Sequence, residues 1–176
     1  GHEAAKEWLP RGLRELQQQV NELVYEDGGF SQHSLIYHRM LLHDLCWCRR
    51  RLELAGQGIP AWLDAAGKRA LGFLMTITDP ATGQAPLYGS NDGANVLPLA
   101  DADFLDLRPV IQMAAAVFQG ELPLPAGPLD EAAAWLIADV DSLHRVPWPA
   151  APARLPAPVA RCFALQPGRH RPLPRL

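Results

Sequence analysis

The chain has 176 residues, a length typical of one domain or of a piece of a larger protein. Its formal net charge is −3, but no acidic residue follows Asp141, whereas six arginines do. The first 141 residues therefore hold all 19 acidic and the remaining 10 basic residues, a net charge of −9. A body this acidic is a poor binder of nucleic acid, and no apolar run approaches the roughly 20 residues of a membrane span. We therefore expect no nucleic-acid partner and no membrane span.

Apolar periodicity predicts helices in chain order. Glu3 begins a helical segment, and Pro10 is expected in the first turn of the next, whose apolar stripe from Leu13 to Val24 ends at Asp27-Gly28-Gly29. Ser31 is the expected N-cap of a second long helix. That second helix is expected to run to about Ala55. The remaining helices are expected from Pro60 to about Asp79, from Leu107 to Phe118 and from Asp130 to about Asp139.

This order of elements predicts an all-α fold, and helix pairs joined by glycine-rich turns suit an α/α array. The expected helical domain covers residues 3–142. The Pro/Arg-rich tail at 143–176 is expected to be irregular or disordered, since eight of the last 32 residues are proline. Residues 79–103 are rich in turn residues, and a loop of this length is usually functional or disordered.

The start of the second long helix carries groups suited to proton transfer. His33 and Tyr37 are four residues apart, so they share one face of a helix. A hydrogen-bonded pair at the edge of the core is the alternative interpretation of this spacing.

His33 and His38 are five residues apart, which does not match a helical metal-binding pair, and Cys46 and Cys48 suit buried thiols better than a disulfide or zinc site. We expect no metal and no cofactor.

The long loop carries a second polar cluster. The side chains of Asn91 and Asp92 can bind sugar hydroxyls, and they can equally cap the backbone of their own loop. Asp101, Asp103 and Asp106 lack the spacing of a calcium loop and are expected to be capping carboxylates.

Together these segments resemble the heparinase II/III-like family of polysaccharide lyases. Residues 13–39 are similar to that family's helix, Asp-Gly-Gly turn and Gln-x-Ser-x-x-Tyr-His stretch, here Asp27-Gly28-Gly29 and Gln32-His33-Ser34-Leu35-Ile36-Tyr37-His38. Tyr88-Gly89-Ser90-Asn91-Asp92-Gly93, Leu97-Pro98-Leu99 and Asp106-Leu107-Arg108-Pro109 resemble its downstream loop. The resemblance covers about residues 13–118.

The resemblance implies part of an (α/α) toroid that lacks the family's C-terminal antiparallel β-sandwich. It also implies a periplasmic or secreted enzyme that cleaves an acidic, uronate-containing polysaccharide by β-elimination, although the start of the chain does not look like a signal peptide. The reaction needs a group that neutralises the uronate carboxylate, a base that removes the C5 proton and an acid that protonates the departing O4.

The resemblance assigns the proton transfer to Tyr37, with His38 as a second candidate. Gln32, His33, Asn91 and Asp92 are the expected substrate-binding residues. The family's neutralising Asn or Asn-His element lies upstream of the matching segment, so we expect this chain alone to be an incomplete and inactive fragment.

Two other functions fit the same sequence. One is a non-catalytic helical module that binds glycans or proteins and is linked to exopolysaccharide handling. The other is a different α/α-barrel enzyme, such as an unsaturated-uronyl hydrolase, which needs two carboxylates facing one cleft. The sequence contains no evident carboxylate pair of that kind.

Overall fold

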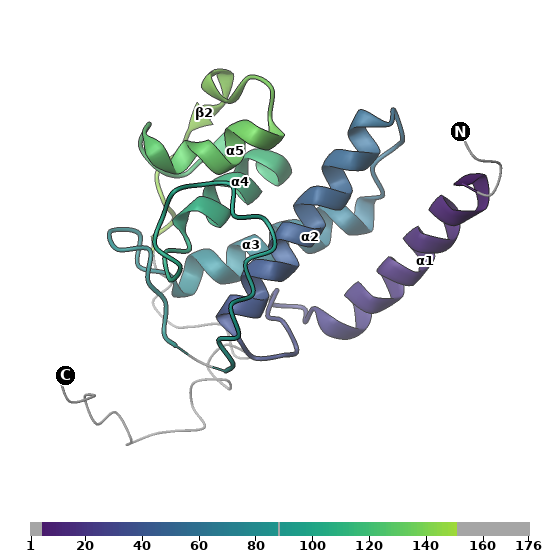
Figure 1. Cartoon of the computed structure of the whole chain (residues 1–176), viewed down its shortest axis with the longest axis horizontal. Coiled ribbons are helices and arrows are strands. Elements are labelled where there is room, and N and C mark those ends of the chain that lie inside the picture. The colour runs from purple at the N-terminus through teal and green to yellow at the C-terminus, as the bar shows by residue number, and fades with distance from the viewer. Residues whose placement is uncertain (1–4, 88, 151–176) are drawn as a thin grey trace.

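The computed structural model describes residues 5–87 and 89–150, and this part of the chain is mostly helical (Figure 1). This confirms the all-α prediction at the level of fold class. No helix within the described residues is both long and apolar enough to cross a bilayer. The helices are α1 (Ala5–Leu23), α2 (Leu35–Leu54), α3 (Ala61–Ile77), α4 (Arg108–Gln119) and α5 (Glu131–Leu136), with short 3-10 turns at Pro128–Asp130 and Val140–Ser142.

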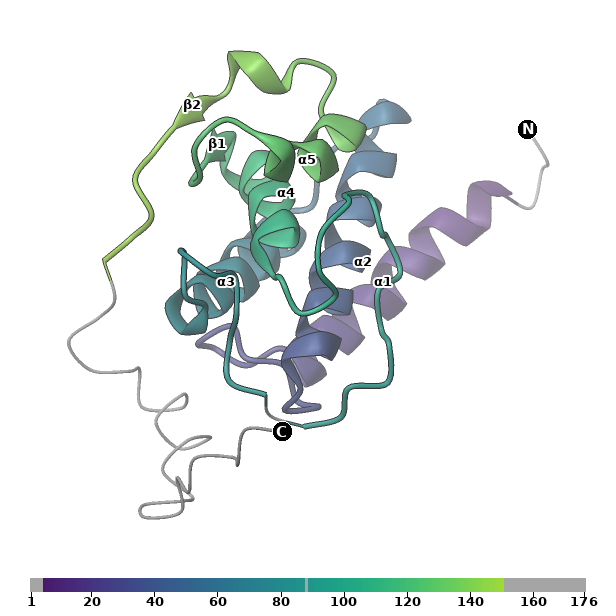
Figure 2. The ribbon, with the colours of Figure 1, turned by 60° about the vertical axis from the view of Figure 1, so that its left-hand side comes forward.

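The core lies where α2, α3 and α4 meet (Figure 2). Their apolar residues recur at helical spacing, so each helix turns one apolar face toward the other two. Burial is complete or nearly so for Leu42 and Leu45 of α2, Leu71 and Leu74 of α3, and Ile111 of α4. Cys46 is buried in the same cluster and Cys48 is half-buried, and both thiols are free, as expected.

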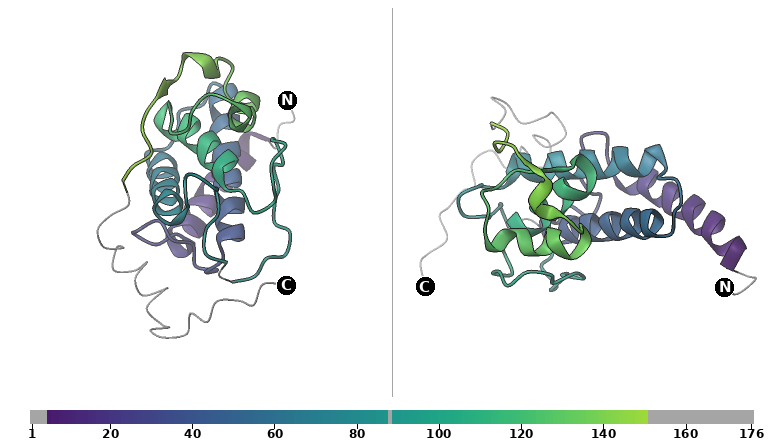
Figure 3. Two further views of the ribbon diagram at one scale, coloured as in Figure 1. Left: turned by 90° about the vertical axis from the view of Figure 1, so that its left-hand side faces the viewer. Right: turned by 90° about the horizontal axis from the view of Figure 1, so that it is seen from above.

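Helix α1 runs obliquely to this core, and its N-terminal half stands away from α2 and α3 (Figure 3). Val20 and Val24, near its C-terminal end, are buried in the core cluster, whereas Trp8 is 64% exposed. Pro10 lies inside α1. The expected break before Pro10 was therefore wrong, and one helix continues through it.

The chain after α4 packs back onto the helices. Two short strands, β1 (Glu121–Leu122) and β2 (His144–Arg145), pair in parallel, and Arg145 forms an ion pair with Asp130 at 2.7 Å. Trp148 contacts the main core cluster. The expected domain boundary at residue 142 therefore lies inside the packed part of the chain, because these contacts are long-range and leave no periodic sequence pattern. Residues 151–176 of the expected tail lie outside the described residues.

Candidate functional site

The Asp-Gly-Gly turn fixes the approach to α2. Val24 and Phe30 form an antiparallel bridge across the turn, and the Asp27 carboxylate accepts a hydrogen bond from the Gly29 N–H at 3.0 Å. Gly28 has a left-handed φ of 90°, and a Cβ at this position would clash with the Arg69 carbonyl of α3. Only glycine combines this backbone conformation with so close an approach. The turn is therefore docked directly on the backbone of α3.

Helix α2 begins three residues later than expected. His33 adopts a left-handed φ of 51°, which is uncommon for a non-glycine residue and extends the turn. Ser34, not Ser31, is the N-cap, and its hydroxyl oxygen accepts a hydrogen bond from the Tyr37 N–H at 3.3 Å. The same hydroxyl donates to the Ser90 carbonyl at 2.6 Å. One side chain therefore caps α2 and holds the distant second motif against it.

Gly89 brings the two motifs into backbone contact. Its φ is 76°, and a Cβ there would clash with the His33 carbonyl oxygen. A larger residue would push the loop away from the start of α2. Tyr88, the first residue of this motif, lies outside the described residues.

Tyr37 and Asp92 form the central contact of the candidate site. The Tyr37 hydroxyl donates a hydrogen bond to the Asp92 carboxylate at 2.8 Å, although the two residues are 55 positions apart in the chain. This bond, together with the negative charge of the carboxylate, raises the pKa of Tyr37 above its ordinary value. Tyr37 is half-buried and Asp92 is exposed, so the pair lies at the surface. The arrangement favours the protonated phenol, which is the form that can act as an acid.

His38, the second candidate for proton transfer, faces the interior. It is 1% exposed, its Nε2 lies 2.8 Å from the Ala70 carbonyl of α3, and its ring stacks on Phe73. Burial lowers its pKa to about 4. Nδ1 is buried without a hydrogen-bond partner. A ring in this position supports the packing of α2 on α3 and has no path to a polymer at the surface.

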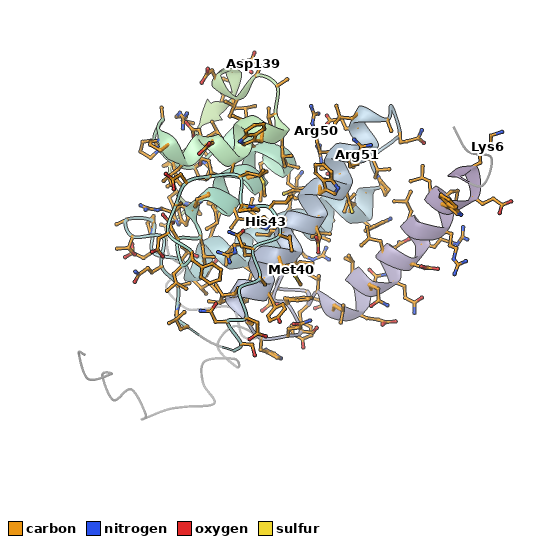
Figure 4. The ribbon with its side chains drawn as sticks, viewed as in Figure 1. Lys6, Met40, His43, Arg50, Arg51 and Asp139 are labelled. Atoms are coloured by element: carbon orange, nitrogen blue, oxygen red, sulfur yellow. The ribbon has the colours of Figure 1, made fainter. Side chains whose placement is uncertain are left out.

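The α3–α4 loop (residues 78–107) follows α2 along one side (Figure 4, where His43 is labelled beside it). The buried Arg39 guanidinium donates to the Ala94 carbonyl at 3.0 Å and to the Phe104 carbonyl, and it lies 4.4 Å above the Phe104 ring. The Leu97 N–H donates to His43 Nδ1 at 3.3 Å. Side chains of α2 therefore hold the loop through its backbone.

Four of the contacts along α2 keep a nearly constant register, whereas Arg39 and Phe104 are 65 residues apart. Ser34, Tyr37, Arg39 and His43 meet loop positions that are 56, 55, 55 and 54 residues further along the chain. Loop and helix therefore run side by side in the same direction. The buried, uncharged state of His43 matches its acceptor role, since burial and the neighbouring Arg39 charge lower its pKa to about 4.

The other expected binding residues lie in the same two motifs as the Tyr37–Asp92 pair. Gln32 and His33 are exposed in the turn before α2, and the His33 ring lies 5.9 Å from that of Tyr25. Asn91 lines a pocket of about 130 Å³ that Leu35 and Ile36 also line. The pocket is mostly apolar, so Asn91 supplies one of its few polar groups.

Asp103 and Asp106 act as capping carboxylates, as expected. They accept hydrogen bonds from the N–H groups of Leu105 at 2.8 Å and Arg108 at 2.9 Å. Within residues 5–87 and 89–150, no three His, Cys, Asp or Glu side chains are grouped to hold a metal ion. The expectation that the chain uses no cofactor stays a prediction.

Sequence reasoning missed the roles of Ser34, Arg39 and His43. A signal was present for two of them, because Arg39 and His43 occupy positions i and i+4 of one helix, on either side of the apolar run from Met40 to Leu42. Both side chains are 3% exposed in the structure. Polar side chains at buried helical positions need partners, and here the loop backbone supplies them.

Comparisons of this chain with protein-family models, with curated proteins and with solved structures found no match.

Proposed function

We propose that this chain is the helical part of a polysaccharide lyase that cleaves a uronate-containing polymer by β-elimination, with Tyr37 as the acid. The observation that carries the proposal is the hydrogen bond between Tyr37 and Asp92, which joins two separate sequence motifs at the surface. The resemblance to the heparinase II/III-like family also leads us to propose that the helices form part of an (α/α) toroid and that the protein is periplasmic or secreted.

In the proposed reaction the two members of the pair have different roles. The Asp92 carboxylate takes the proton from C5, the electron pair of that bond forms the C4–C5 double bond, and the C4–O4 bond breaks. Tyr37 gives its proton to the departing O4. The proton on Asp92 then passes to the phenolate along the existing hydrogen bond, which restores the starting pair. Because the pKa of Tyr37 is raised, the side chain stays protonated and enters the reaction as the acid.

The uronate carboxylate still has to be neutralised. The pair itself carries a negative charge, and a uronate would be repelled by it without a cationic or hydrogen-bonding group nearby. The resemblance assigns this role to an element upstream of the matching segment. His38, being buried, supports α2 in this proposal and does not contact the substrate.

The test uses the full-length gene product that contains this chain, incubated with a panel of uronate polymers. We expect ultraviolet absorbance from an unsaturated uronyl product with the natural sequence. Tyr37→Phe removes only the hydroxyl, and we expect the rate to fall by at least about 100-fold, the lower range for a general acid. Tyr25→Phe is the matched control, because Tyr25 is 40% exposed and lies outside the pair. A Tyr37→Phe protein as active as the control would refute the assignment.

Asp92→Asn tests the second half of the pair. The carboxylate raises the pKa of Tyr37, so this substitution should bring the pKa back toward its ordinary value in a spectrophotometric titration and should also abolish product formation. If the natural protein binds a uronate polymer but yields no unsaturated product, it is the non-catalytic binding module.

A further inference from the structure

A small pocket lies beside the candidate site, at the first turn of α2. Two consecutive residues of the helix, Leu35 and Ile36, line it together with residues of the α3–α4 loop. Ile36 is the chain neighbour of Tyr37. Asn91, which also lines the pocket, is the chain neighbour of Asp92. The pocket and the Tyr37–Asp92 pair are therefore adjacent along both segments, and a group bound in the pocket lies next to the pair.

The volume of the pocket, about 130 Å³, limits what can enter it. An apolar cavity of roughly 150 Å³ holds a group the size of benzene. A whole sugar residue with its hydroxyl groups is larger than that, whereas a substituent on a sugar is smaller. The walls are mostly apolar, and Leu105 and Leu107 complete them on the loop side. The substituent that gains most from burial here is therefore itself apolar.

Charge narrows the choice further. None of the described residues that line the pocket is charged, and its polar side chains are those of Gln84, Ser90 and Asn91. Beside it lies the Asp92 carboxylate, and the first 141 residues carry a net charge of −9. A free uronate carboxylate would lose its hydration in this pocket without gaining a cation, and Asp92 would repel it. The pocket therefore suits a neutral group.

We propose that the pocket holds the methyl ester of an esterified uronate, so that the preferred polymer is a methyl-esterified polyuronate. This inference rests on the lyase function proposed above. The carboxyl carbon is bonded to C5, whose proton passes to Asp92, so the carboxyl substituent is the one that lies closest to the base. Its methyl group suits the apolar walls, and its carbonyl oxygen can accept a hydrogen bond from the amide of Asn91 or Gln84.

An ester also changes the chemistry at C5. A carboxyl group without negative charge withdraws electrons from C5 and makes its proton more acidic, which is the effect that a neutralising group has on a free carboxylate. The proton passes to Asp92, the C4–C5 double bond forms, the C4–O4 bond breaks, and O4 takes the proton of Tyr37. The ester bond stays intact, so the product is an unsaturated methyl uronate. The substrate thus supplies the neutral carboxyl group that a free acid obtains only from the protein.

The test gives the full-length gene product each uronate polymer in three forms. One form has free carboxyl groups, one has methyl-esterified carboxyl groups, and one has free carboxyl groups and acetylated hydroxyl groups. We expect kcat/KM for the unsaturated product to be at least about tenfold higher with the methyl ester than with the free acid, the lower range for one added carbon in an apolar pocket. Because esters also eliminate more readily in solution, the ratio of ester to free acid is compared between variants.

Leu87→Lys tests whether the pocket causes the preference. Leu87 lines the pocket and is 71% exposed, so a lysine there adds a cation at its edge without disturbing the core. We expect the ratio of ester to free acid to fall by at least about threefold, as for an exposed ion pair. Val96→Lys is the matched control, because Val96 is 48% exposed on the same loop and is not among the residues that line the pocket. It should leave the ratio unchanged.

The failure of this inference differs from the failure of the lyase proposal. No unsaturated product from any form of any polymer overturns the lyase function and the ester preference with it. Product from the free acids at an equal or higher rate leaves the lyase function in place and overturns the ester preference. A preference for the acetylated form, or an ester preference that Leu87→Lys leaves unchanged, overturns the assignment of the pocket to a methyl ester.

Discussion

The two sides of α2 are held in place by different kinds of contact. On one side Leu42, Leu45 and Cys46 are buried in an apolar cluster with α3 and α4. On the other side Arg39 and His43 hold the α3–α4 loop by hydrogen bonds to its backbone. Apolar burial stabilises the whole domain, whereas the hydrogen bonds shape one segment that carries a candidate site residue, Asp92. Substitutions on the two sides should therefore differ in their effects on the stability of the whole domain and of the loop.

The apolar side should show the largest effect. Leu45→Ala removes a side chain that is 1% exposed, and we expect a loss of about 2–5 kcal/mol in the free energy of unfolding, measured with urea. Leu54→Ala on the same helix is the control, because Leu54 is 62% exposed and should lose no more than about 0.5 kcal/mol. Similar losses for both variants would mean that α2 is not packed through this face.

Acid should reduce the stabilisation from both sides of α2, since each side contains one buried histidine. Burial lowers the pKa of His38, against α3, and of His43, against the loop, from 6.5 to about 4. The unfolded chain thus binds more protons between these values, so the stabilisation is complete above about pH 6.5 and is lost as the pH falls toward 4. Each histidine contributes at most about 3 kcal/mol to this loss.

Two substitutions separate the histidines. His38→Gln keeps a donor near the Nε2 position for the Ala70 carbonyl, and His43→Asn keeps an acceptor near the Nδ1 position for the Leu97 N–H. Each should flatten the dependence of the unfolding free energy on pH between 4 and 6.5, as followed by urea titrations at several pH values. If the unfolding free energy depends on pH as before after both substitutions, the dependence comes from other titratable groups.

A substitution on the loop side should have the smallest effect on the free energy of unfolding. It should also destabilise the loop locally. Arg39→Met leaves the Ala94 and Phe104 carbonyls without their donor, at a cost of about 1–3 kcal/mol. We expect the amide hydrogens of residues 94–104 to exchange faster while those of α3 stay protected, as measured by hydrogen–deuterium exchange. Arg51→Met, at an exposed position on the same helix, should change neither. Equal acceleration in α3 would show that Arg39 stabilises the core as well.

The apolar side was predictable from sequence, and the loop side was not. The spacing of Leu42 and Leu45 repeats locally, so it can be recognised in one helix at a time. The partners of Arg39 lie 55 and 65 residues away and are carbonyl groups, which every residue has. The N-cap was misplaced by three residues for a related reason, because the turn at His33 lies against Gly89, which is distant in the chain. Tyr37 and Asp92 were both singled out, but only the three-dimensional fold brings them together.

The steady register between α2 and the loop has a consequence for how this segment can change over generations. Surface loops usually accept insertions and deletions with little harm. Here a one-residue change of length between Ser90 and Ala94 would shift Ala94 and Leu97 past their partners on α2, Arg39 and His43. Substitutions that leave the backbone path intact should be accepted far more readily. In its tolerance to change, this irregular segment should therefore resemble a strand at the centre of a sheet more than a loop.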